Sequence, residues 1–128
     1  MKETTAAWIA KAESDFSAAR LMLEYGEESI ADAVCFHCQQ CAEKYLKGFL
    51  HEQEIEFRRE HDLIPLLELC AAVDGAFGGL HKTLESLEGY AVAIRYPEAV
   101  ATRSMAEEAL AAATRVRAFI RGKLGLPD

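Results

Sequence analysis

The chain has 128 residues and a formal net charge of −7, with 51% hydrophobic and 27% charged side chains. This length fits one domain whose hydrophobic core needs neither disulfides nor a metal. The acidic balance excludes a general nucleic-acid binder, because phosphate binding depends mainly on Lys and Arg, but it allows a local basic patch. No segment has the unbroken apolar length of a signal peptide or a membrane span, so we expect a cytoplasmic protein without membrane contact.

Apolar side chains recur at steps of three and four along most of the chain, which is the spacing of helices that bury one face. The pattern predicts helices over residues 5–25, 30–50, 63–73, 77–94 and 104–122. Ser29 is a suitable N-terminal cap for the second helix, and Ser104 with Glu107 forms a capping box for the fifth. No strand period is present. The expected fold is all-α, an antiparallel up-and-down bundle of four to five helices in a single domain of residues 1–128.

Three of the four cysteines, Cys35, Cys38 and Cys41, lie three residues apart in the second predicted helix. Steps of three fan the thiols over a helix face, so they cannot surround one tetrahedral metal ion. We therefore expect buried, reduced cysteines that pack as small hydrophobic residues, and neither a metal nor a cofactor.

Up-and-down helices would place the loop after the second helix and the loop after the fourth at one end of the bundle. That arrangement brings several polar side chains together. They are Lys47, Arg58, Arg59, His61, Arg95, Tyr96 and Arg103. Arginine binds phosphate through its planar fork of donors, and the N-termini of the third and fifth helices would favour an anion. The alternative is a solvated end, neutralised by the acidic residues of the same loops.

Three short motifs occur in order along the chain. They are Phe36-His37-Cys38-Gln39-Gln40-Cys41-Ala42-Glu43-Lys44-Tyr45-Leu46-Lys47, His61-Asp62-Leu63 and Arg95-Tyr96-Pro97. Together they resemble the HEPN family, and the resemblance spans nearly the whole chain. It implies a helical bundle that pairs into a homodimer and associates with nucleotides or RNA. Many members are partners of a minimal nucleotidyltransferase, often as a toxin–antitoxin pair, whereas others are metal-independent endoribonucleases.

The endoribonucleases of the family carry an Arg, four to six further residues and then a His, and this motif is missing here. After Arg95 the corresponding positions hold Val100, Ala101 and Thr102. Because His is the side chain best suited to move a proton near neutral pH, its absence argues against this activity. His61 would replace it only if it lies close to Arg95.

A polar stripe on the second predicted helix comprises His37, Gln40, Lys44 and Lys47, and its first three residues are the expected polar groove. It faces either a dimer groove or a ligand, or it belongs to an ordinary helix surface on which Glu43 pairs with Lys47. The leading hypothesis is a homodimeric module that binds a nucleotidyltransferase, a nucleotide or RNA, with phosphate held by the cluster of cationic residues and Tyr96 as a stacking face. The alternatives are an endoribonuclease toxin that uses Arg95 and His61, and a structural dimer without a ligand.

Overall fold

The computed structural model describes residues 1–93 and 96–128, and in these ranges it contains five α-helices, two 3-10 helices and no strand. In chain order the elements are α1 (Glu3–Tyr25), η1 (Glu28–Ile30), α2 (Ala31–Glu52), α3 (Leu63–Val73), η2 (Gly75–Leu80), α4 (His81–Ala93) and α5 (Arg103–Leu124). The predicted all-α bundle is confirmed. The fourth predicted helix is shorter than expected, because Phe77 falls in η2, and its predicted end at Ile94 lies outside the described residues.

The central element is α2, which contacts α1, α3, α4 and α5. Fourteen of its 22 residues are buried, among them the three cysteines, which pack as small hydrophobic side chains. At Gly48 the backbone of α2 approaches α1 so closely that an added Cβ would lie 3.0 Å from Ile9 Cδ1. The helix is therefore the axis of the core, and little of its surface is left for function.

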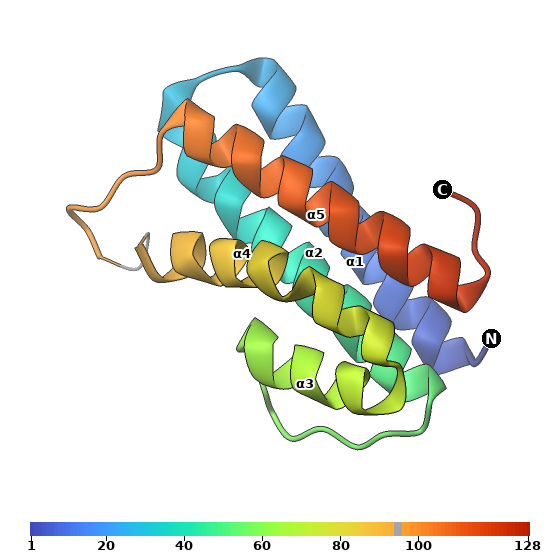
Figure 1. The fold of residues 1–128 in the computed structure, drawn as a ribbon. Helices are drawn as coiled ribbons and strands as arrows, with labels where there is room; N and C mark the ends of the chain where they lie inside the picture. Colours follow the sequence, from blue (N-terminus) through green and yellow to red (C-terminus); the bar gives the residue numbers. More distant parts are fainter. Residues whose placement is uncertain (94–95) are drawn as a thin grey trace.

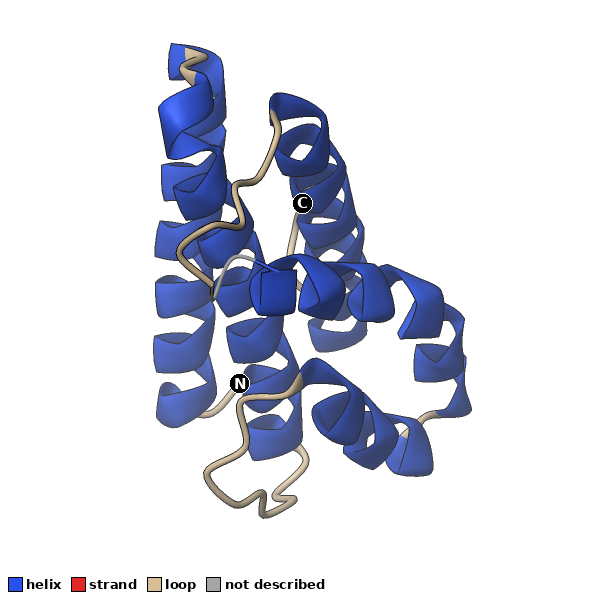
Figure 2. Ribbon diagram, turned by 90° about the vertical axis from the view of Figure 1, so that its left-hand side faces the viewer, coloured by secondary structure: helices blue, strands red, loops and turns tan. Residues whose placement is uncertain are grey.

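The three long helices α1, α2 and α5 lie side by side (Figure 1). The backbone N–H of Lys2 donates to Glu52 Oε1, so α1 begins where α2 ends. Arg103 at the start of α5 donates to the carbonyl of Gly26 at the end of α1. Consequently α1 is antiparallel to both α2 and α5, and these two run in the same direction. Figure 2 shows α4 lying across the long helices, with α3 beside it.

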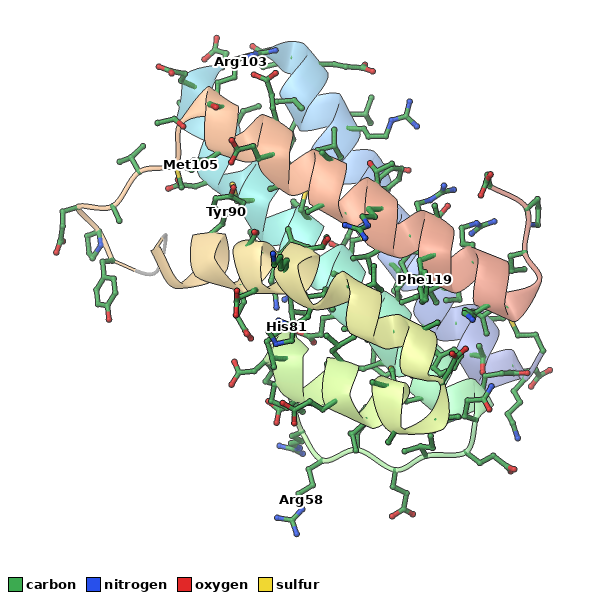
Figure 3. All side chains as sticks on the ribbon, viewed as in Figure 1. Arg58, His81, Tyr90, Arg103, Met105 and Phe119 are labelled. Carbon is green, nitrogen blue, oxygen red and sulfur yellow. The ribbon has the colours of Figure 1, made fainter. Side chains whose placement is uncertain are left out.

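The loop over residues 53–62 corrects the predicted topology. In an up-and-down bundle, α3 would run back along α2. Here the loop itself runs back along the outside of the bundle, and α3 begins only after this return (Figure 1). The backbone N–H of Leu63 donates to Glu88 Oε1 at 2.7 Å, which places the start of α3 beside the second half of α4. As a result, the end of the 53–62 loop lies beside α4, whereas Arg103 at the start of α5 lies at the opposite end of the molecule from Arg58 (Figure 3), so the prediction that these two arginines meet is wrong.

Two predicted helix caps are also corrected. A short 3-10 turn precedes α2, so Ser29 does not cap this helix, and Asp32 instead accepts a hydrogen bond from the backbone N–H of Ala101 at 2.6 Å. The cap of α5 is Thr102, two residues before the predicted Ser104, and its hydroxyl accepts from the N–H of Met105. The Asp32 contact fixes the segment before α5 against the start of α2.

Candidate functional site

The accessible side of α2 is a narrow strip along an otherwise buried helix. From residue 33 to residue 50, only five side chains are not fully buried. They are Ala33, Phe36, His37, Gln40 and Lys44, and we call them the α2 strip. Because they are spaced by one, three or four residues, they share one face of the helix. All three residues predicted to form a polar groove lie on this strip.

At one edge of the α2 strip, a buried carboxylate from α1 binds two strip residues. Asp15 Oδ1 lies 2.8 Å from His37 Nδ1, and Asp15 Oδ2 accepts a hydrogen bond from Lys44 Nζ at 2.5 Å. The Asp15 side chain is 11% exposed, compared with 25% for His37. A buried carboxylate needs such partners. The contact orients the imidazole, and its Nε2 has no hydrogen-bond partner among the described residues.

At the other edge, a second buried carboxylate makes a similar cluster. Glu43 Oε2 accepts a hydrogen bond from Lys47 Nζ at 2.9 Å and lies 3.3 Å from His61 Nδ1. The side chains of Glu43 and Lys47 are 5% and 7% exposed, whereas that of His61 is 76% exposed. Glu43 and Lys47 are thus paired as predicted, but in the interior and not on the helix surface. Their pairing anchors the exposed imidazole of His61 on one side.

Aromatic rings cover Lys47 and hold the 53–62 loop on the bundle. Its Nζ atom lies 5.6 Å from the ring centre of Trp8 and 5.8 Å from that of Phe57. The two rings contact each other edge to face, with centroids 6.3 Å apart. Cation–π contacts of this kind strengthen when the cation is shielded from water. Phe57, in the middle of the loop, is therefore fixed to α1 and α2.

Two glutamines extend the contacts of the Glu43 cluster onto the α2 strip. Gln40 Nε2 donates to Gln39 Oε1 at 2.9 Å, and Gln39 Nε2 donates to the carbonyl oxygen of His61 at 3.2 Å. Gln40 lies three residues after His37 on the same helix, so the two side chains share a face of α2, and Gln40 in turn leads through Gln39 to the start of α3.

The predicted phosphate-binding residues are brought together only in part. Arg58, Arg59 and His61 lie on the same loop and are exposed, and neither arginine has an ion-pair partner in residues 1–93 and 96–128. Figure 3 shows Arg58 extending away from the bundle. Tyr96 is 60% exposed. Arg95 lies outside the described residues, so its distance from His61 stays a prediction.

Other parts of the predicted phosphate cluster are placed elsewhere. Lys47 is buried against Glu43, so its ammonium is not presented to solvent at this end. Arg103 lies at the opposite end of the molecule from Arg58 (Figure 3). The first backbone N–H of α3, that of Leu63, already donates to Glu88. The N-terminus of α5 begins at Arg103 and is therefore far from Arg58. Neither helix N-terminus adds to the predicted phosphate cluster.

The cysteines show no sign of a reactive or metal-binding role. Burial raises the pKa of Cys35 to about 11 and that of Cys38 to about 12, which keeps both thiols protonated at neutral pH. Burial likewise raises the pKa of Cys70 to about 12. Among the residues that the structure describes, no group of three His, Cys, Asp or Glu side chains could hold a metal ion.

Sequence reasoning missed Asp15 and Gln39 as parts of this site and treated Glu43 only as a surface partner of Lys47. Asp15 gave one signal: it is an acidic residue beside the predicted apolar face of the first helix, next to Phe16. A buried carboxylate requires a partner. Its partners lie 22 and 29 residues away, and helix periodicity alone does not identify them.

The fold and this site define an all-α bundle whose central helix carries a polar strip between two buried carboxylates. The HEPN domain model matches residues 5–123, and the chain belongs to the HEPN family. It is similar to the crystal structure of ST0689, an archaeal HEPN homologue, with 28% identity, a TM-score of 0.72, and coverage of 96% of this chain and 98% of that one.

The chain is also similar to the crystal structure of TT1696 from Thermus thermophilus. Here the identity is 27% and the TM-score 0.76, with coverage of 95% of this chain and 99% of the other. No curated protein matches the sequence. In the described part of the chain, none of the helices is both long enough and apolar enough to span a bilayer.

Proposed function

We propose that this chain is a homodimeric module that binds the phosphates of a nucleotide or RNA and associates with a minimal nucleotidyltransferase, as in a toxin–antitoxin pair. The observation that carries the proposal is the exposed group of Arg58, Arg59 and His61 next to the α2 strip. Two adjacent guanidinium groups without an ion-pair partner in the described residues are available to bind phosphate in a bidentate manner. The sequence lacks the Arg and His spacing of the family's endoribonucleases.

Binding is tested by thermal unfolding with AMP and with a short single-stranded RNA. A ligand at 100 times its Kd stabilises the native state by about 2.7 kcal/mol. The double substitution Arg58→Ala with Arg59→Ala should abolish the shift and reduce the salt dependence of RNA binding by about one unit of slope per lost phosphate contact. The control removes the same charge elsewhere, with Lys11→Ala and Lys82→Ala, both exposed. An unchanged shift in the arginine variant contradicts the proposal.

Exposed apolar side chains support the homodimer. Leu21 and Tyr25 near the end of α1 are 66% and 73% exposed, and Phe36 on the α2 strip is 50% exposed. Because α1 and α2 are antiparallel, the last turns of α1 lie along the first turns of α2. We propose that these side chains contact a second copy of the chain, since exposed apolar patches mark protein contacts. Light scattering should give a dimer mass for the wild type and a monomer mass for Phe36→Glu; a wild-type monomer contradicts the proposed dimer.

Association with a nucleotidyltransferase rests on the family resemblance. The expected observation is a gene for a small nucleotidyltransferase beside the gene for this chain, and a complex of the two proteins in gel filtration. If the adjacent protein is purified and does not bind, this part of the proposal is wrong, while phosphate binding is tested separately.

The contact between Glu43 and His61 favours one second candidate, a metal-independent endoribonuclease that uses Arg95 and His61. Glu43 contacts Nδ1 of His61, so Nε2 of the same ring points away from Glu43. In this position Nε2 would accept a proton from a substrate hydroxyl, as a general base does. Cleavage of RNA in the presence of EDTA, lost in both Arg95→Ala and His61→Ala, would support this function over binding alone. A structural dimer without a ligand is the outcome if neither binding nor cleavage is observed.

A further inference from the structure

His37 lies outside the arginine cluster, and its contacts differ from those of an ordinary surface histidine. Its Nδ1 atom lies 2.8 Å from the buried Asp15, while its side chain is 25% exposed. By contrast, His81 on α4 lies 3.9 Å from Glu85, and both side chains are at least half exposed. A fixed imidazole at the edge of an accessible strip can present Nε2 to a ligand, whereas a mobile one makes no defined site.

The net charge around His37 depends on whether its ring carries one proton or two. Asp15 from α1 carries one negative charge, and Lys44 on the same helix carries one positive charge at 2.5 Å from it. The neighbouring Phe36 ring and the imidazole contact each other edge to face, with centroids 5.4 Å apart. With a neutral imidazole the cluster has no net charge, and with an imidazolium its charge is +1. Only the protonated form has both a donor at Nε2 and an excess positive charge to offer an anion.

The side chain of Gln40 lies on the α2 strip between this cluster and the hydrogen bonds of the proposed phosphate site. These hydrogen bonds lead from His61 through Gln39 to Gln40, which lies one helical turn from both His37 and Lys44. The two histidines have similar contacts: a buried carboxylate that also binds a lysine lies at Nδ1 of each ring, Glu43 with Lys47 at His61 and Asp15 with Lys44 at His37. On the loop, Glu60 accepts from the N–H of His61, while Arg58 and Arg59 add positive charge.

We propose that the α2 strip is a proton-linked anion site, in which His37, held by Asp15 as a positioning residue, takes up a proton when the phosphate of a nucleotide binds. The proton comes from the solvent and adds to Nε2, which then donates a hydrogen bond to a phosphate oxygen; no covalent bond to the ligand forms or breaks. The inference rests on the proposed binding of nucleotide phosphates and deepens it. It predicts that affinity rises as pH falls through the titration range of histidine, because the bound state holds more protons.

The test is calorimetric titration of the full chain with AMP near neutral pH, in two buffers of different ionisation enthalpy. The difference in binding enthalpy gives the number of protons taken up with each AMP. We expect net uptake in the wild type and a decrease of up to about one proton in His37→Gln, since one imidazole accepts one proton. The matched control, His81→Gln, should leave the uptake unchanged.

Asp15 is tested by the pH profile of the same titration. Asp15→Asn removes the carboxylate that supports an imidazolium, so proton uptake should fall although His37 is present, and Asp15→Glu should restore part of it. If Asp15→Asn does not fold, His37→Gln decides the question. AMP binding with the same proton uptake in the wild type and in His37→Gln overturns this inference and leaves the proposed function intact. Absence of AMP binding to the wild type overturns this inference, and the proposed phosphate binding is overturned with it if the wild type binds no RNA either.

Discussion

Loss of the carboxylate at Glu43 should destabilise the protein strongly, because it leaves the ammonium of Lys47 buried without a counter-charge. The two side chains are 5% and 7% exposed and are joined at 2.9 Å. Removing one partner of such a buried pair costs about 3–5 kcal/mol. We therefore expect Glu43→Met to lower the free energy of unfolding by this amount, which corresponds to roughly 10–20 °C in Tm for a domain of this size.

The matched control is Glu107→Met on α5. Glu107 also pairs with a cation at a spacing of four residues, Arg103 at 3.6 Å, but both side chains are about half exposed. An exposed pair contributes at most about 1 kcal/mol. The assay is urea unfolding followed by circular dichroism.

The double variant Glu43→Met with Lys47→Met removes both charges and should recover most of the lost stability, since apolar replacement of a buried pair is often neutral. Two results would refute the reasoning. One is a loss in Glu43→Met no larger than in Glu107→Met, and the other is a double variant less stable than the single one.

The other predictions concern packing, thiols and acid stability. Gly48→Ala should lower the free energy of unfolding by about 1–3 kcal/mol, because the added Cβ would lie 3.0 Å from Ile9 Cδ1. Gly89→Ala should raise it by about 0.5–1 kcal/mol, because there is open space around the added Cβ. Urea unfolding measures both changes. All four thiols are buried and free, so iodoacetamide should label them at the rate of unfolding, and faster labelling of the folded protein would contradict this. The guanidinium of Arg117 lowers the pKa of Glu13, so the stability from this pair is present at neutral pH and is lost as pH falls from about 4.5 through the lower folded-state value. Glu13→Gln should show a smaller loss of stability over that range in pH-dependent urea unfolding, and an equal loss would show that the pair is not responsible.

The order and extent of the helices could be read from the sequence, because helix periodicity is a local property. The steps of three and four in α1 and α2 predicted which faces are buried, and the buried cysteines follow from the same pattern. Three motifs were enough to identify the HEPN family, as the match over residues 5–123 shows. Of the predicted polar stripe, His37, Gln40 and Lys44 lie on one accessible face of α2, whereas Lys47 is buried.

The tertiary structure alone decided which distant side chains meet. The 53–62 loop is long enough to run in either direction along the bundle with nearly the same loss of chain entropy, so its length does not fix the direction of α3. For this reason the prediction that Arg58 meets Arg103 was wrong. Likewise, the burial of Lys47 depends on Trp8 and Phe57, which lie on α1 and on the loop. Periodicity indicates that Asp15 is close to the core, but only the packing of α1 against α2 selects His37 and Lys44 as its partners, because such pairing depends on the relative shift of two helices.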